Sequence, residues 1–349
     1  FKTNNATGIV FNGVTYTNGQ TLKIPKDEAA VNKYHIYGTY GTRYAFSSWS
    51  TTAGTFENQN YQNTAFTVTG DATITLTGQY VSTAMQNLSA SSCTTTARPV
   101  YDNRDNTVYW IQKLPDNNCW MLDNLALDLT SSTIVNALST TNTHLDATSL
   151  TYFKNGGGTT SDRYPTVAYG TFGSTGSYSQ PLTYTTNKDI ILRPSTATNY
   201  TDSIAGAYGL GQGKIGAYYN YCAASVGYYC FNNSSSADGS GGVYDACPAG
   251  WRMPTGGASS EFKTLYTSSA INSDIATYSN ALSVSFSGRM LSSGSVLYLG
   301  SQSDLWTSTG DSDDNYRGAY SVIIETNKAN LESTISRNAA ISVRCVLGS

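Results

Sequence analysis

The sequence predicts a mainly β protein with some α+β character, organised in two parts. Only 12% of the 349 residues are charged, about half the usual proportion of roughly 25%. Solubility therefore rests on Ser, Thr, Asn and Gly, and these residues, together with 27 Tyr, favour strands and turns over helices. At about 150 residues per domain, the length suggests roughly two domains.

Charge and hydropathy exclude two classes of partner. A net charge of −3 leaves no basic surface for a nucleic-acid backbone. No apolar run approaches about 18 residues, so we expect no membrane insertion within this chain. The chain begins at Phe1 without a leader, and we expect a mature, secreted form whose signal was removed or lies outside it.

Residues 1–82 are predicted to form a small β module. The Asn12-Gly13 pair, flanked by alternating apolar residues, predicts a hairpin. Residues 66–68 and 74–76 alternate around Gly70-Asp71 and predict a second hairpin. The strand between them carries two aromatic residues, and the expected core of this module contains Phe46, Trp49, Phe66 and Ile74.

Residues 83–92 are small and polar, which predicts a linker or a short helix before a second domain at 93–349. In that domain, residues 108–111 and 119–122 predict two strands joined by a turn at 116–118. Residues 131–138 and 259–266 are the two best helix candidates, and the second has apolar residues at helical spacing with Ser259 or Ser260 as its cap. The Gly, Tyr, Ser and Thr-rich stretch 154–243 predicts long surface loops.

Residues 44–50, followed by 64–74, resemble the internalin-type B-repeat, whose pattern joins an aromatic-x-x-Trp strand to a Thr-rich hairpin containing Gly-Asp-Ala-Thr. The resemblance covers roughly residues 5–81. It implies a β-grasp-like module of the kind found in the stalks of bacterial surface proteins.

Four ordered blocks resemble the Fibrobacter-type major paralogous (FISUMP) domain, namely residues 118–125, 247–255, 305–309 and 341–346. That family is placed with the C-type-lectin-like and formylglycine-generating-enzyme-like folds. The resemblance implies a C-type-lectin-like domain with a small antiparallel sheet and long loops, used for ligand binding at the cell surface.

Six cysteines allow fifteen disulfide connectivities, and their number alone does not choose among them. The FISUMP resemblance agrees with a Cys247–Cys345 pair. Beside it we expect Cys222 with Cys230, which would close a Tyr-rich loop, and Cys93 with Cys119. Such disulfides indicate an oxidising, extracellular compartment.

No catalytic constellation stands out, so we expect a protein that is not an enzyme and needs no cofactor. The two histidines, His35 and His144, lie in no recognisable nucleophile motif, and G-x-S-x-G does not occur. Neither histidine is near a cysteine, so a zinc site is not expected. Trp120, Trp251 and Trp306 are predicted to fill the core, as large aromatics on short strands usually do.

The acidic run at 311–315 offers oxygen ligands for calcium, but it lacks the glycine and glutamate of an EF-hand loop. We interpret it as an exposed turn, with no metal, and leave a calcium site open as the alternative.

The C-type-lectin-like arrangement implies that segments 311–320 and 327–338 form an exposed sheet face. Either this face recognises a ligand, as aromatic and adaptable polar residues do in paratopes, or it is ordinary solvated sheet. Its candidate contact residues are Asp313, Asn315, Tyr316, Arg317, Asn327, Lys328, Asn330, Arg337 and Asn338.

Three functional hypotheses follow. The first is a non-enzymatic bacterial cell-surface adhesion or ligand-binding protein, with a lectin-like head on a repeat stalk and a protein or glycan on another cell surface as partner. The second is a structural subunit of a surface array or filament, formed by self-association. The third is a formylglycine-generating-type oxidase or a hydrolase.

Overall fold

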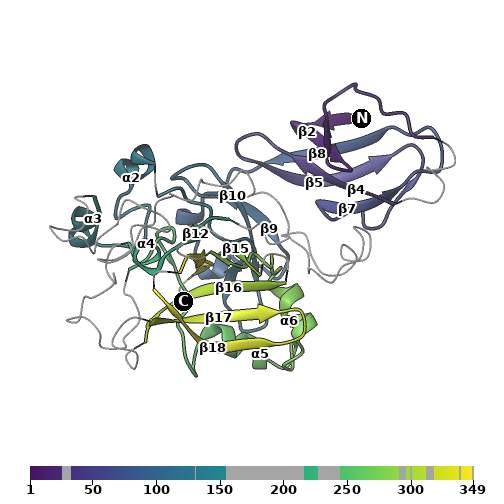
Figure 1. Ribbon diagram of the computed structural model, residues 1–349. Helices are drawn as coiled ribbons and strands as arrows, with labels where there is room; N and C mark the ends of the chain where they lie inside the picture. The colour runs from purple at the N-terminus through teal and green to yellow at the C-terminus, as the bar shows by residue number, and fades with distance from the viewer. Residues whose placement is uncertain are drawn as a thin grey trace.

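The computed structural model describes residues 1–25, 33–129, 131–154, 216–226, 244–290, 296–298, 301–311, 318–337 and 339–347. Within these residues the protein is mainly β, as the composition predicts, and its helices are short. The two halves of the chain form separate groups of sheets joined near residue 82 (Figure 1). None of the described helices is long and apolar enough to cross a membrane.

The first half is built from two sheets that share an aromatic core. One sheet has the order β1 (Lys2–Asn4), β8 (Ile74–Tyr80) and β5 (Tyr44–Thr51). The other has the order β3 (Val14–Tyr16), β2 (Gly8–Phe11), β4 (Lys33–Thr39), β7 (Asn63–Thr67) and β6 (Thr55–Phe56). A β-grasp-like module would have a helix on its sheet; residues 1–25 and 33–82 contain none, residues 26–32 lie outside the described part, and the β-grasp-like arrangement stays a prediction.

The expected core of this half is confirmed. Phe46, Trp49, Phe66 and Ile74 are all at most 5% exposed. A bulge in the pairing of β5 with β8 lies between Phe46 and Ser48. Because side chains alternate along a strand, this extra residue lets Phe46 and Trp49, three positions apart, both face the core.

The first predicted hairpin is confirmed and the second is wrong. Phe11 pairs with Val14 across Asn12 and Gly13, both of which have positive φ, as a two-residue hairpin turn requires. The strands on either side of Gly70-Asp71, β7 and β8, do not pair with each other, because β7 pairs with β4 and β6 while β8 pairs with β1 and β5. The segment between them crosses from one sheet to the other.

The junction consists of two short 3-10 turns, η1 (Met85–Asn87) and η2 (Ala90–Ser92), which fits the expected short helix. It is fixed to the second half, since Met85 is buried and its carbonyl accepts a hydrogen bond from Trp251 Nε1 at 3.1 Å. From the first half, the Arg43 guanidinium lies 3.7 Å from the centre of the Tyr101 ring. The two halves therefore meet through specific contacts.

The second half contains two five-stranded sheets and a two-stranded ribbon. The first sheet has the order β13 (Trp251–Arg252), β20 (Val346–Leu347), β11 (Cys119–Met121), β10 (Val108–Lys113) and β9 (Arg98–Tyr101). The second has the order β12 (Tyr218–Tyr219), β19 (Ile341–Ser342), β16 (Gln302–Gly310), β17 (Gly318–Glu325) and β18 (Ala329–Ser336). The ribbon pairs β14 (Arg289–Met290) with β15 (Val296–Leu297).

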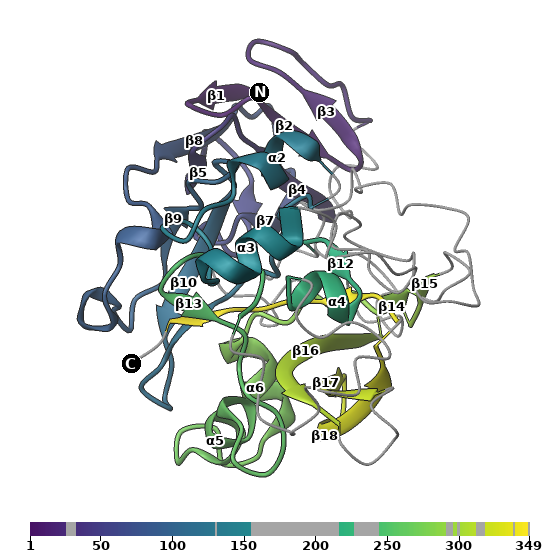
Figure 2. The same cartoon turned by 90° about the vertical axis from the view of Figure 1, so that its left-hand side faces the viewer.

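In the described part of the second half, short helices lie next to these sheets (Figure 2). They are α2 (Ser132–Ala137), α3 (Ala147–Lys154), α4 (Tyr221–Ala224), α5 (Glu261–Thr267) and α6 (Ile275–Ala281). The two predicted helices are confirmed, and Ser260, one of the two expected caps, accepts from Lys263 N; Ser131, which was not predicted as a cap, accepts from Ile134 N. The predicted turn at 116–118 is confirmed as the link between β10 and β11, with Asn117 at φ 67°.

Two of the three expected disulfides are confirmed. Cys93 is bonded to Cys119, and Cys247 to Cys345 across 98 positions of sequence. The expected Cys222–Cys230 pair lies outside the described side chains.

The expectation of surface loops over 154–243 is wrong for residues 216–226. Tyr218, Tyr219 and Tyr221 are at most 4% exposed and belong to the core of the second half. The rest of that stretch, 155–215 and 227–243, lies outside the described residues.

Candidate functional site

The surface expected to recognise a ligand lies around strands β16, β17 and β18. Four of its candidate residues are described, namely Asn327, Lys328, Asn330 and Arg337. The other five lie outside the described residues, and they are Asp313, Asn315, Tyr316, Arg317 and Asn338.

The sheet around β16 is covered on both faces. Consecutive side chains of a strand point to opposite faces, and both Leu305 and Trp306 are fully buried. Leu305 belongs to the core that contains Phe262 of α5, while Trp306 packs edge-to-face on Tyr221 of α4, with ring centres 5.1 Å apart. The Trp306 indole also donates to Tyr219 O at 2.7 Å, so Trp306 is a core residue as predicted.

The open sheet face expected over 311–320 is therefore not present in its described part. Gly318 and Ala319 are buried, and Asp311 is only 7% exposed. Sequence reasoning treated this sheet as a surface layer, but the helices α4 and α5, far apart in the chain, cover it from both sides.

Arg337, expected on the exposed face, is instead 2% exposed. Its Nε donates to Gly318 O at 2.8 Å, and its guanidinium lies 5.3 Å from the centre of the Tyr221 ring. A Cβ atom at Gly310 would lie 2.7 Å from Arg337 Nη2, so a side chain at that position would displace the guanidinium from where it lies. Arg337 therefore links the end of β18 to the start of β17 and is not part of an exposed face.

Polar side chains remain exposed along the β17–β18 hairpin. Strand β18 alternates, because Leu331 and Ile335 are buried while Glu332 and Thr334 are exposed. We call the exposed set the hairpin surface, and it consists of Asn327, Lys328, Asn330, Glu332 and Thr334.

The charges of the hairpin surface are paired locally. Lys328 Nζ lies 3.4 Å from Glu325, and Lys263 of α5 forms an ion pair with Glu332. Exposed pairs of this kind contribute only about 0–1 kcal/mol to stability. The hairpin surface therefore presents amide, hydroxyl and paired charged groups on a buried scaffold, and such a surface can exchange hydrogen bonds with a polar partner.

The acidic run begins at Asp311, and its other residues lie outside the described part. Among the residues that the structure describes, no group of three His, Cys, Asp or Glu side chains is arranged to hold a metal ion. The interpretation of residues 311–315 as a turn stays a prediction.

A buried polar cluster that the sequence did not reveal lies beside the Cys247–Cys345 disulfide. Arg104 Nε and Nη2 contact both carboxylate oxygens of Asp102 at 2.6–3.0 Å, and both side chains are fully buried. Arg104 Nη1 also donates to Ala246 O at 2.8 Å. The Asp-x-Arg spacing is the only local sequence signal of this cluster, since Ala246, the other partner of Arg104, is 142 positions away.

Asp245 and His144 extend this cluster towards the surface. The two oxygens of Asp245 accept the backbone N–H groups of Cys247 and Met253 at 2.9 and 2.8 Å. His144 Nδ1 lies 3.2 Å from Asp245 Oδ2. Burial lowers the pKa of His144, but its interactions with Asp245 outweigh that effect, and its pKa is raised overall. Asp245 accepts backbone N–H groups on both sides of Trp251. The His144–Asp245 pair therefore stabilises the backbone next to the Cys247–Cys345 disulfide.

Comparison with known proteins gives no relative. No family model, no curated protein and no solved structure matches the chain.

Proposed function

We propose that this chain is a non-enzymatic extracellular protein that binds a protein or glycan on a cell surface. The two disulfides support an oxidising compartment, where such bonds form and persist. The resemblance to FISUMP domains is part of the proposal. Two of its blocks contain strands β11 and β13, and a third ends at Val346, the first residue of β20; β20 lies between the other two in one sheet, with Trp120 opposite Val346.

The observation that carries the proposal is the hairpin surface. Strand β18 is anchored by the buried Leu331 and Ile335, and β16 in the same sheet is buried on both faces, so the exposed polar side chains sit on a rigid base. Rigid placement lowers the entropy lost when a partner binds. Paired charges and adaptable amides fit a polar partner such as a glycan or a protein loop better than an apolar one.

A glycan array and a cell-surface pulldown test this proposal with the full chain. We expect the double variant Lys328→Ala/Asn330→Ala to weaken the captured interaction at least fivefold. The matched control Lys2→Ala/Asn87→Ala removes the same groups from exposed positions elsewhere and should change binding less than twofold. Equal binding by both double variants would show that the hairpin surface is ordinary solvated sheet.

A second candidate function is self-assembly into a surface array or filament. It is favoured by β18, an eight-residue strand that ends the order of its sheet. An edge strand can pair with another chain through its backbone. Light scattering that rises with protein concentration, together with regular particles in electron micrographs, would favour assembly over adhesion.

The third hypothesis, a formylglycine-generating-type oxidase or a hydrolase, has less support. The four cysteines whose side chains are described form two disulfides, so while oxidised they do not offer the free thiol pair of such an oxidase.

A further inference from the structure

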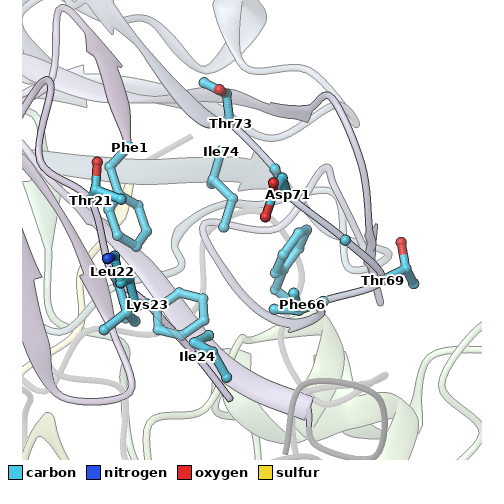
Figure 3. Close-up of a pocket in the computed structure, with 14 residues that line it drawn as sticks. Phe1, Thr21, Leu22, Lys23, Ile24, Phe66, Thr69, Asp71, Thr73 and Ile74 are labelled. Carbon is cyan, nitrogen blue, oxygen red and sulfur yellow. The ribbon is translucent and has the colours of Figure 1, made fainter. Parts of the chain in front are cut away.

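The first half of the chain contains a cavity that the proposed function does not use. Its volume is about 840 Å³, and it lies between the segment after β3 and the connection from β7 to β8. Figure 3 shows Phe1, Phe66 and Ile74 pointing into this space from three different parts of the chain. All the lining residues belong to the part of the chain that the structure describes.

The cavity has an apolar floor and a polar rim. Phe11, Phe66 and Ile74 are at most 5% exposed and form the floor. Apolar side chains continue up the walls at Phe1, Leu22, Ile24 and Val68. The exposed polar lining residues are Thr21, Lys23, Thr69, Asp71 and Thr73.

The two segments that frame the cavity are tied to the sheets. Thr69 Oγ1 accepts from Gly54 N at 2.9 Å, and Thr73 N donates to Thr52 Oγ1 at 2.8 Å, which fixes both ends of the β7–β8 connection. On the other side, Gly19 N donates to Phe1 O at 2.9 Å. The β7–β8 side of the opening is therefore held in place, which fits the preformed openings that most small-molecule sites have.

We propose that this cavity binds an amphipathic small molecule, with an aliphatic body on the floor and a polar end at the rim. The volume lies within the range of about 300–1,000 Å³ that is usual for such sites. Because the side chains of Phe11, Phe66 and Ile74 offer no hydrogen bonds, a sugar placed there would lose those that its hydroxyl groups make with water. An aliphatic chain loses none and gains burial of its apolar surface. This site is separate from the hairpin surface and from the partner proposed for it.

Calorimetric titration of the full chain with decanoate, butanoate and maltose tests the ligand class. We expect decanoate to bind at least tenfold more tightly than butanoate, because the longer chain buries more apolar surface. We expect maltose not to bind at this site. Absent decanoate binding, equal affinity for the two acids, or competition by maltose would each overturn the proposal.

A matched pair of variants tests the location. Leu22 is 37% exposed on the cavity wall, and Val14 is 55% exposed outside the lining. Leu22→Asp should weaken decanoate binding at least tenfold, while Val14→Asp should change it less than twofold. An equal loss of decanoate binding in both variants would mean a general effect on the fold of the first half and would refute the proposed location of the site.

A filling variant gives an independent test of location. A Cβ atom at Gly70 on the rim would meet nothing within 4 Å, whereas at Gly41, away from the cavity, it would make an ordinary contact with Thr7 at 3.8 Å. Gly70→Trp should weaken decanoate binding at least tenfold, and Gly41→Trp should change it less than twofold. Unchanged binding in Gly70→Trp, with an unchanged circular dichroism spectrum, would place the ligand elsewhere.

Discussion

The buried ion pair of Asp102 and Arg104 makes a strong prediction about the stability of the second half. The guanidinium contacts both carboxylate oxygens and the Ala246 carbonyl, and both side chains are fully buried. Gln86 Nε2 also donates to Asp102 at 2.8 Å. Either charge left alone would stay buried without its counter-charge.

The expected magnitudes follow from that burial. Removing one member of a buried pair costs about 3–5 kcal/mol, because the remaining charge is uncompensated. We therefore expect Asp102→Asn and Arg104→Met each to lower the free energy of unfolding by about 3–5 kcal/mol. The double variant leaves neither member of the pair buried alone, so it should cost no more than the more damaging single variant, giving a coupling energy of about 3–5 kcal/mol.

Urea unfolding at neutral pH, followed by tryptophan fluorescence, measures these differences, since four of the five tryptophans lie after residue 92. The exposed pair Lys263–Glu332 is the control, with side chains 39% and 43% exposed. Lys263→Met, Glu332→Gln and their combination should each change stability by less than about 1 kcal/mol. Additive costs for the buried pair, with the double variant near the sum of the singles, would refute the reasoning.

Three further predictions concern the same half. Replacing Cys247 and Cys345 by Ala should lower the free energy of unfolding by about 4–5 kcal/mol on the chain-entropy model, because their bond spans 98 positions; a loss below about 1 kcal/mol in chemical denaturation would contradict this. Trp306→Ala should lower the free energy of unfolding by about 3–5 kcal/mol, because the ring is fully buried. Asn330→Ala, at an exposed position, should change it by less than about 0.5 kcal/mol. Thermal melts of the two variants and of the wild type measure both differences. The pKa of His144 is raised in the folded state. The protonated imidazole therefore stabilises the fold fully below the unfolded pKa of about 6.5, and this stabilisation is lost as the pH rises through the pKa of the folded state. His144→Gln should therefore destabilise more at pH 5.5 than at pH 8.5 in urea titrations, and an equal effect at both pH values would argue against the ion pair with Asp245.

The candidate site illustrates how far sequence reasoning reached. Asn327, Lys328 and Asn330 are exposed as expected, because a polar turn and an alternating strand are visible in the sequence. The burial of Arg337 could not be foreseen, since it depends on Tyr221, more than a hundred positions away, and on the absence of a side chain at Gly310. The cavity of the first half was missed for a similar reason, because its lining comes from segments that are separated by some fifty positions of sequence.

The sequence alone determined the features whose physical cause is local. The Asn12-Gly13 turn needs residues that tolerate positive φ, and the helix after Ser260 needs an oxygen that accepts a free backbone N–H, so a few neighbouring residues specify each. The mainly β composition and the burial of the large aromatic residues were also determined at this level.

Only the tertiary structure decided which strands pair and which faces are covered. The residues on either side of Gly70-Asp71 alternate as a hairpin would, yet β7 and β8 lie in different sheets, and Phe66 and Ile74 meet in the core that those sheets share. The alternating pattern indicates that one side of each strand is buried, but it does not indicate which other element covers that side. Pairing is set by the packing of the whole chain, and for that reason the sequence predicted the two strands around Gly70-Asp71 but wrongly paired them, and wrongly placed residues 311 and 318–319 on an open sheet face.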